Sequence, residues 1–250
     1  MTATVSFDFT GSHALITGGT SGIGRAVAGL LRDAGAVVTV TGTRVDAAEY
    51  DTDLDGLDYR RLVLTDPDSV AATACEFADL DILVNNAGAN FPGGRDESDA
   101  DGFEASVALN LGGHYRLTVA LHRALKASAV RGGGASVVNI ASISALRAVP
   151  LVPGYAAAKA GLINLTRNLA VKWAGDGIRV NAVAPGLIDT PMTAPMHAYR
   201  PLLDSELAHI PLGRMGTAAE VATTIAFLCT AGSAYTSGAV FVVDGASDCV

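Results

Sequence analysis

The chain has 250 residues, of which 50% are hydrophobic and 17% are charged, and its formal net charge is −8. This composition predicts a packed globular protein, and the negative charge disfavours a general affinity for nucleic acid or anionic lipid. The 3 cysteines form neither a disulfide framework nor a metal-ligand spacing. Without a recognisable signal peptide or an apolar run of roughly 20 residues, we expect a soluble cytoplasmic protein.

Short runs rich in Val, Ile and Leu alternate with longer helical stretches along the chain. The predicted strands are 13–17, 37–41, 81–85, 136–140, 178–184 and 239–243, with 61–64 as a seventh candidate. The predicted helices are 23–34, 69–78, 102–128, 155–174 and 218–230. Because repeated strand–helix–strand units make right-handed crossovers, we expect an α/β fold. It would be a single doubly wound Rossmann domain over 1–250, with a mainly seven-stranded parallel sheet and helices on both faces.

Two segments interrupt this alternation. Residues 44–61 are short and acidic, and their weak periodicity makes a full helix there doubtful. Residues 186–217 form a long insertion that contains four prolines. Connections of this length inside a domain are typically functional, so we expect a substrate lid at about 186–217.

The sequence TGGTSGIG follows the first predicted strand and leads directly into a helix. Its glycines permit a tight turn and a close backbone approach, and a helix N-terminus presents free N–H groups to a pyrophosphate. A tight strand-to-helix turn alone would also explain glycines here, but the position at the first crossover favours a dinucleotide site. The expected contacts are Gly18, Thr20, Ser21, Gly22, Ile23 and Gly24.

The end of the second predicted strand should distinguish NADP from NAD. An acidic residue there would bind the adenine ribose hydroxyl of NAD, whereas a basic residue accommodates the 2′-phosphate of NADP. This chain has Gly42, Thr43 and Arg44 at that place, and Asp46 lies further along. We therefore expect NADP, with NAD as the alternative because Arg44 can equally be a solvated surface charge.

A tyrosine and a lysine lie one helical turn apart at the start of the predicted helix 155–174. Residues i and i+4 share a helix face, so Tyr155 and Lys159 should project together toward the carboxyl edge of the sheet, where doubly wound folds bind ligands. A neighbouring ammonium should lower the pKa of the Tyr155 phenol from its usual value of about 10, which suits acid–base catalysis. Ser142 ends the apolar run just before this helix.

The motifs TGGTSGIG, Ser142, Tyr155 and Lys159 occur together with Asn110, NNAG (85–88) and NAVAPGLIDT (181–190). With these motifs, the chain resembles the short-chain dehydrogenase/reductase family from about residue 8 to about 245. Within the family, the chain is similar to 3-oxoacyl carrier-protein reductases. The resemblance implies that Tyr155 transfers a proton while hydride moves to or from a nicotinamide. It implies that Ser142 holds the substrate oxygen, that Lys159 also binds the nicotinamide ribose, and that Asn110 anchors a water linked to Lys159. The implied further cofactor contacts are Thr43, Arg44, Leu64, Asn86, Ala87, Gly88, Ile140, Pro185, Gly186, Ile188 and Thr190.

The expected function is therefore that of an enzyme, an NAD(P)-dependent oxidoreductase acting on CH–OH and C=O groups. Apolar side chains in the loop 143–154 and in the lid favour a hydrophobic ketone or secondary alcohol as substrate, with a 3-oxoacyl thioester also possible. The alternative is a catalytically inactive nucleotide-sensing protein of the same fold, which would have no chemical need for the Ser, Tyr, Lys and Asn set. The resemblance also implies a homo-oligomer, and we expect a homotetramer with 222 symmetry.

Two groups of polar residues are given simpler interpretations. The 5 histidines share no ligand spacing, so we expect no metal site and interpret each histidine as a surface or helix residue. The acidic stretch 96–101 is interpreted as a solvated helix entry that interacts favourably with the helix dipole.

Overall fold

A parallel sheet runs through the centre of the computed structural model, which describes residues 5–130 and 134–250. The strand order is β3-β2-β1-β4-β5-β6-β9, and it reverses between β1 and β4. This reversal opens a crevice outside the carboxyl ends of the strands, where doubly wound folds bind ligands. The expected Rossmann fold class is confirmed. The strands are β1 His13–Ile16, β2 Val37–Gly42, β3 Asp58–Arg61, β4 Ile82–Asn85, β5 Ala135–Ile140, β6 Ile178–Pro185 and β9 Val240–Val243.

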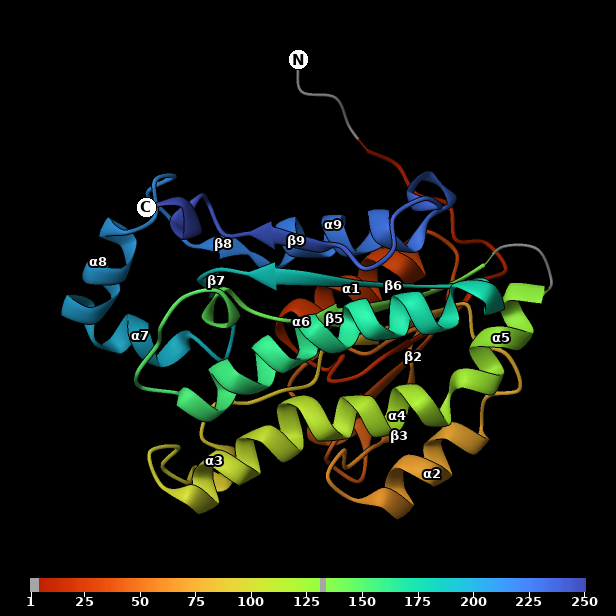
Figure 1. Ribbon diagram of the computed structural model, residues 1–250, viewed down its shortest axis with the longest axis horizontal. Helices are drawn as coiled ribbons and strands as arrows, with labels where there is room; N and C mark the ends of the chain where they lie inside the picture. Colours follow the sequence, from red (N-terminus) through yellow and green to blue (C-terminus); the bar gives the residue numbers. More distant parts are fainter. Residues whose placement is uncertain (1–4, 131–133) are drawn as a thin grey trace.

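Helices cover both faces of the sheet and bury two apolar cores (Figure 1). On one face α1 and α9 pack against each other, and on the other face α2 contributes Val70 to the second core, while α4, α5 and α6 contribute leucines and Trp173. The helices are α1 Gly22–Asp33, α2 Pro67–Cys75, α3 Ala100–Val107, α4 His114–Ala120, α5 His122–Val130, α6 Pro153–Trp173, α7 Ala194–Ala198, α8 Arg200–Ala208 and α9 Ala218–Cys229. Within the described ranges, none of these helices is both long and apolar enough to cross a membrane.

Shorter elements complete the connections. The two-residue strands β7 (Ile188–Asp189) and β8 (Gly216–Thr217) pair in parallel, so they join the ends of the 186–217 segment, which also contains α7 and α8. The single helical turns are η1 Ala47–Glu49, η2 Pro92–Gly94, η4 Ile143–Ala145, η5 Ala174–Asp176, η6 Ala231–Ser233 and η7 Ser247–Cys249.

The seventh strand differs from the sequence prediction in position. The strand is β3, Asp58–Arg61, rather than 61–64, because β3 is an edge strand whose pairing with β2 ends where Gly42 meets Arg61. The apolar residues Leu62 and Leu64 follow the strand and are buried in the loop behind it. As expected, residues 44–57 contain no full helix; they hold the single turn η1.

The predicted helix 102–128 is interrupted. Between α3 and α4 the chain forms a wider π-helical turn, η3 (Ala108–Gly113), and a second break at Leu121 separates α4 from α5. Gly113 packs so closely on the loop after β3 that an added Cβ would lie 2.7 Å from the Leu64 Cβ. A π turn re-aims the side chains that it carries and is frequent at functional sites, and Asn110 lies on this one.

A buried polar network connects the central strands to the helices below them. Asn85 of β4 donates to the Thr118 hydroxyl (2.7 Å) and to the Asn139 side-chain oxygen of β5 (2.8 Å), and Asn139 donates to the Thr166 hydroxyl of α6 (2.8 Å). All four side chains are at most 2% exposed. Because an unpaired buried polar group is costly, this network fixes α4 and α6 against the strands that end at the crevice.

Candidate active site

A cavity of about 390 Å³ lies at the carboxyl edge of the sheet, in the expected crevice. Most of the residues predicted from the sequence line it, together with Tyr50, Leu62 and Met192, which were not among the expected cofactor contacts. Three predicted residues do not line it: Gly24 lies beneath the glycine turn, Arg44 lies at the rim beside Tyr50, and Asn110 lies behind Gly88. The predicted residues that line the cavity are Gly18, Thr20, Ser21, Gly22, Ile23, Thr43, Leu64, Asn86, Ala87, Gly88, Ile140, Ser142, Tyr155, Lys159, Pro185, Gly186, Ile188 and Thr190.

The glycine turn is shaped for close backbone approach. Gly18 has a left-handed φ of +63°, and a Cβ there would lie 2.9 Å from the Cα of Ala87. Gly24 packs against the Gly18 carbonyl and the Asn86 side chain, so a Cβ has no room. The turn ends at Ser21, the N-cap of α1, which makes no side-chain capping hydrogen bond. The N-terminus of α1 therefore faces the cavity with free N–H groups, and these residues fit a dinucleotide pyrophosphate.

At the tip of β2, Arg44 is held by two tyrosines. Its guanidinium lies 4.7 Å from the centre of the Tyr50 ring. Its backbone N–H donates to the Tyr50 hydroxyl (3.1 Å), and its carbonyl accepts from the Tyr59 hydroxyl (2.6 Å). The Tyr50 hydroxyl also fills the space beside Gly42 where a side chain would begin. Sequence reasoning did not find Tyr50, because the acidic segment 44–61 carries no periodic pattern that marks it.

Ser142, Tyr155 and Lys159 line the same cavity as the glycine turn. Tyr155 and Lys159 share a face of α6, and the Lys159 Nζ lies 5.4 Å from the centre of the Tyr155 ring. Lys159 is only 2% exposed, and its Nζ donates to the carbonyl of Ile140 at the end of β5 (2.7 Å). Ser142 is the N-cap of η4, and its Oγ accepts from the Ser144 N–H (3.1 Å).

The electrostatics of this group differ from the sequence expectation. Burial lowers the pKa of Lys159 to about 7. The pKa of Tyr155 is raised to about 12, chiefly by burial, with a hydrogen bond from Ser142 opposing the rise and the charge of Glu97 adding to it. The expected lowering by Lys159 was wrong for this structure, because a lysine that is itself desolvated holds too little charge to stabilise a phenolate.

Asn110 supports the wall of the cavity from behind. Its side-chain Oδ1 accepts from the Ala89 N–H (3.1 Å), and its Nδ2 donates to the Ala89 carbonyl and to the Ser106 carbonyl (3.0 Å each). Oδ1 is also the atom nearest to the place where a Cβ on Gly88 would lie, with the Lys159 Nζ next. Asn110 therefore fixes the segment after NNAG beside Lys159.

Two ionisable groups near the site are buried, although the sequence marked neither of them as buried. Glu97 belongs to the acidic stretch that was expected to be solvated, yet it is 1% exposed. His114 was interpreted as a surface or helix residue; it lies on α4 but is fully buried, and burial together with Lys159 lowers its pKa to about 3. No simple sequence signal marks either residue, since each follows polar or small neighbours that give no apolar period. Among residues 5–130 and 134–250, no cluster of three His, Cys, Asp or Glu side chains could hold a metal ion.

The doubly wound sheet, the glycine turn and the cavity at the carboxyl edge of the sheet define a Rossmann-type protein. Residues 18–246 match the family described as enoyl-(acyl carrier protein) reductase. The chain is 39% identical to a cis-4-hydroxycyclohexanecarboxylate dehydrogenase of Sinomonas cyclohexanicum, over 93% of this chain and 94% of that protein. It is 36% identical to the 3-oxoacyl-[acyl-carrier-protein] reductase FabG of Escherichia coli (strain K12), over 95% and 98% of the two chains.

A solved structure gives the same picture. A putative 2-deoxy-D-gluconate 3-dehydrogenase from Agrobacterium tumefaciens with bound NADP superposes with a TM-score of 0.84 at 33% identity, covering 99% of this chain and all of that one. The chain belongs to the short-chain dehydrogenase/reductase family and is an NAD(P)-dependent oxidoreductase that acts on CH–OH and C=O groups.

Proposed function

We propose that the enzyme moves hydride between a nicotinamide cofactor and a hydrophobic ketone or secondary alcohol, with Ser142, Tyr155 and Lys159 as its catalytic residues. The observation that carries this proposal is that these three side chains and the glycine turn line one cavity. A bound nicotinamide supplies the hydride donor or acceptor. The protein's own residues then have to bind the substrate oxygen and to supply or remove one proton there.

Each side chain suits one part of that task. The Ser142 hydroxyl, which already bonds Tyr155, would hydrogen-bond the substrate oxygen and orient it. The Tyr155 phenol would donate its proton to the carbonyl oxygen in reduction and, as phenolate, remove the alcohol proton in oxidation. Lys159, with its pKa near 7, is suited to exchange a proton at neutral pH and to bind the nicotinamide ribose. Asn110 would hold the chain at Ala89 and anchor a water beside Lys159.

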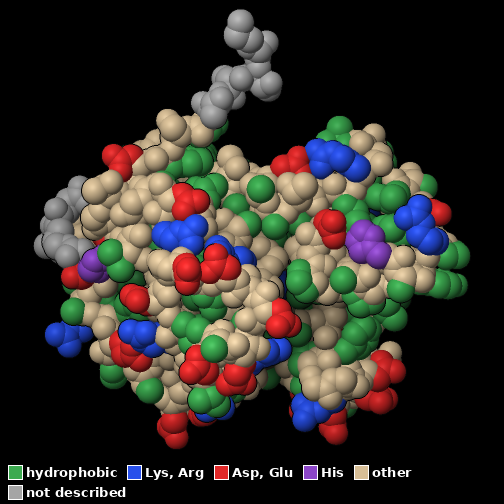
Figure 2. Space-filling model, turned by 180° about the vertical axis from the view of Figure 1, so that it is seen from behind, with side chains coloured by type: hydrophobic (Ala, Val, Ile, Leu, Met, Phe, Trp, Pro, Cys, Tyr) green, Lys and Arg blue, Asp and Glu red, His purple; other side chains and the backbone are tan. Residues whose placement is uncertain are grey.

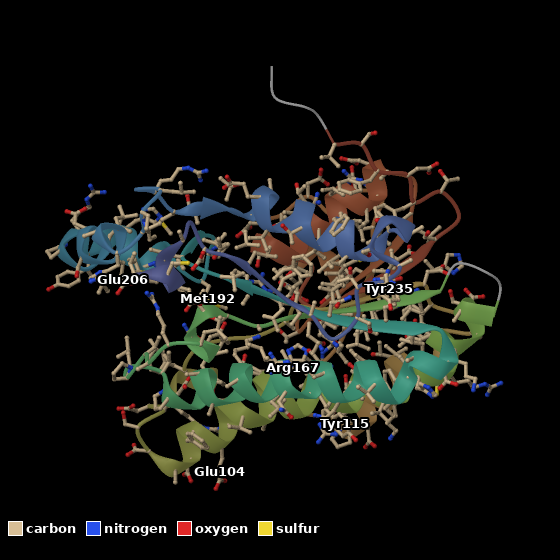
Figure 3. The ribbon with its side chains drawn as sticks, turned by 45° about the horizontal axis from the view of Figure 1, so that its top comes forward. Glu104, Tyr115, Arg167, Met192, Glu206 and Tyr235 are labelled. Atoms are coloured by element: carbon tan, nitrogen blue, oxygen red, sulfur yellow. The ribbon has the colours of Figure 1, made fainter. Side chains whose placement is uncertain are left out.

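The substrate side of the cavity is apolar but open. Met192 lines it from the segment before α7, where the α7–α8 part joins the main body (Figure 3). Seen from behind, the surface is hollowed between this part and the main body (Figure 2). We propose that 1–250 acts as one oxidoreductase domain in which 186–217 is a lid over the substrate. Of the side chains in the loop 143–154 and in the lid that we expected to line the pocket, Leu146, Leu151 and Tyr199 are exposed and do not line the cavity.

The relatives narrow the substrates worth testing. Two of them are named for a cyclic hydroxy acid and for a 3-oxoacyl thioester, so the panel should contain 4-oxocyclohexanecarboxylate, a 3-oxoacyl thioester, and simple cyclic and linear ketones and alcohols. Absorbance at 340 nm follows the cofactor. Turnover of any substrate in the panel supports the proposal. Binding of the cofactor without turnover of any substrate would favour the nucleotide-sensing alternative.

We further propose a preference for NADP over NAD, supported by the placement of Arg44 between Tyr50 and Tyr59. Held in this way, the guanidinium loses little freedom on binding a 2′-phosphate, and a charge-assisted contact of this kind contributes about 1.5–3 kcal/mol. This corresponds to a preference of about ten- to a hundredfold. Arg44→Ala should remove it, measured as the ratio of catalytic efficiencies with NADPH and NADH. Arg60→Ala is the matched control, because it changes a neighbouring arginine that is paired with Glu76. It should leave the ratio of catalytic efficiencies with NADPH and NADH unchanged. Equal ratios in wild type and Arg44→Ala would make Arg44 a surface charge.

A homotetramer and a cytoplasmic location complete the proposal. The outer surfaces of α4 and α6, which lie side by side in Figures 1 and 3, expose Tyr115, Val119 and Val171. Apolar side chains exposed together on adjacent helices are typical of an interface between subunits. Cys75, Cys229 and Cys249 are free thiols, which fits a reducing compartment; fractionation of the host cell would test this location.

A further inference from the structure

Glu97 is a buried carboxylate that joins two parts of the site. It lies in the segment between β4 and α3 and is 1% exposed. Its Oε2 accepts from the backbone N–H of Tyr155 (2.7 Å), and its Oε1 accepts from the backbone N–H of Phe91 (3.0 Å). Burying a carboxylate is costly unless its oxygens are hydrogen-bonded, and here both oxygens bond to main-chain N–H groups beside the cavity.

The helix that carries Tyr155 has no cap of its own. The N-cap of α6 is Val152, which has no side-chain acceptor, and the next residue, Pro153, has no N–H group to satisfy. Gly154 leaves room for the carboxylate, because a Cβ at that residue would lie 3.1 Å from Oε2. Glu97 therefore supplies from a distant segment the acceptor that an N-cap side chain normally supplies, and it does so at Tyr155 itself.

The other oxygen of Glu97 holds a constrained loop. Phe91 has a left-handed φ of +49°, which is uncommon for a residue other than glycine, and its N–H is bound by Glu97. Two residues earlier, Ala89 is bound through both its N–H and its carbonyl by Asn110. The segment 89–91 is thus fixed at one end by Asn110 and at the other by Glu97.

We propose that Glu97 is a positioning residue for the reaction: it fixes the backbone of Tyr155 against the segment 89–91, and its charge raises the pH at which Tyr155 can act as a base. This inference rests on the proposed role of Tyr155 as the proton-transferring group. Among the described residues, the groups that face the phenol are Ser142 beside η4, Lys159 from the same helix and Glu97 from the segment before α3, and the charge of Lys159 in turn acts on the buried His114 of α4.

The sign of the electrostatic effect follows from the charge. A carboxylate beside Tyr155 opposes formation of the phenolate, so the charge of Glu97 raises the pKa of Tyr155. Replacing it by the neutral Gln should lower that pKa by roughly one unit, as expected for one charge acting over a few ångströms of protein. In alcohol oxidation, which needs the phenolate, the rise of activity with pH should move to lower pH by the same amount.

The test uses Glu97→Gln in the full chain and two readouts. The first is the pH profile of kcat/KM for alcohol oxidation, and the second is ultraviolet titration of Tyr155, obtained by subtracting Tyr155→Phe in each background. At pH 10.5 a pKa of about 12 leaves roughly 3% of Tyr155 ionised, and a fall of roughly one unit raises this fraction about eightfold. Asp101→Asn, which neutralises an exposed acid at the start of α3, is the matched control and should leave both readouts unchanged.

The outcomes are distinguishable. A shift to lower pH in both readouts, with far-ultraviolet circular dichroism and NADPH affinity preserved, supports the role of Glu97. Wild-type pH behaviour in both readouts for Glu97→Gln overturns it, whatever the loss of rate. If the wild-type enzyme itself turns over no substrate, the proposed function fails, and the titration, which needs no turnover, still decides whether Glu97 acts on Tyr155.

Discussion

Replacing the buried lysine by methionine should stabilise the protein while it removes activity. In the folded protein the pKa of Lys159 falls from 10.5 to about 7, because burial penalises the charged form. At 1.36 kcal/mol per pKa unit, this burial costs on the order of 5 kcal/mol below pH 7, where the lysine is charged in both the folded and the unfolded chain. Lys159→Met keeps the length of the side chain and removes this cost. It also removes the hydrogen bond from Lys159 to the Ile140 carbonyl, and this loss offsets about 1–2 kcal/mol of the gain in stability.

The stability gained by Lys159→Met should be largest at low pH and should decrease as the pH rises. The folded pKa lies below the unfolded one, so the unfolded state binds more protons between pH 7 and 10.5, and wild-type stability rises with pH across this window. The cost of Lys159 therefore falls to roughly 2 kcal/mol at pH 9 and vanishes above pH 10.5. The variant should gain about 3 kcal/mol at pH 6 and nothing measurable at pH 9.

Thermal unfolding at the two pH values measures this difference. For a chain of this length, about 3 kcal/mol corresponds to roughly 6–12 °C in Tm. Lys172→Met, which changes an exposed lysine in the last turn of the same helix, is the matched control and should show neither the gain nor its pH dependence. A variant that is less stable than wild type at pH 6, or whose gain is equal at pH 6 and pH 9, would refute the assignment of Lys159 as a desolvated amine.

Two further predictions concern stability and assembly. His114 has a folded pKa of about 3 against 6.5 for the free side chain, so the protein has its full stability with a neutral His114 above pH 6.5 and loses stability as the pH falls toward 3. His114→Leu should therefore reduce the loss of unfolding free energy between pH 7 and pH 5 by about 2 kcal/mol, measured by urea unfolding. An unchanged pH dependence of stability in this variant would show that His114 is not desolvated. Light scattering should give four times the chain mass of 25.4 kDa, and substituting Tyr115 and Val119 with Asp should lower that mass; a monomeric wild type would contradict the proposed tetramer.

The sequence predicted the elements whose signal is local. Nearly continuous apolar runs mark strands that are buried on both faces, which is why β1, β2, β4, β5 and β6 lie within a residue or so of their predicted bounds. The edge strand β3 has exposed residues at three of its four positions, so the apolar run that follows it was taken for the strand. The interruption of 102–128 was also missed, because a π turn adds a residue to the helix without changing its composition.

In the candidate site, too, the sequence shows the features that depend on local pattern and does not show those that depend on packing. Glycines and the Tyr155–Lys159 spacing can be read from the chain, since backbone geometry and helix periodicity place them. The role of Glu97 depends on its contact with Tyr155, 58 positions away, and that of Tyr50 depends on contacts with Arg44 and Tyr59, 6 and 9 positions away. The pKa of Tyr155 depends on how deeply its phenol is buried. Packing decides these properties, and no short stretch of sequence records it.

The central claim is that Tyr155 transfers the proton to a substrate bound beside the cofactor. It is tested most directly by comparing wild type and Tyr155→Phe in NADPH-dependent ketone reduction, with NADPH affinity measured by fluorescence in parallel. We expect wild-type turnover, a loss of about 10²–10⁴-fold in kcat for the variant, and NADPH affinity unchanged within about twofold, because the hydroxyl alone is removed. A Tyr155→Phe enzyme that turns over at a rate near that of wild type would contradict the account.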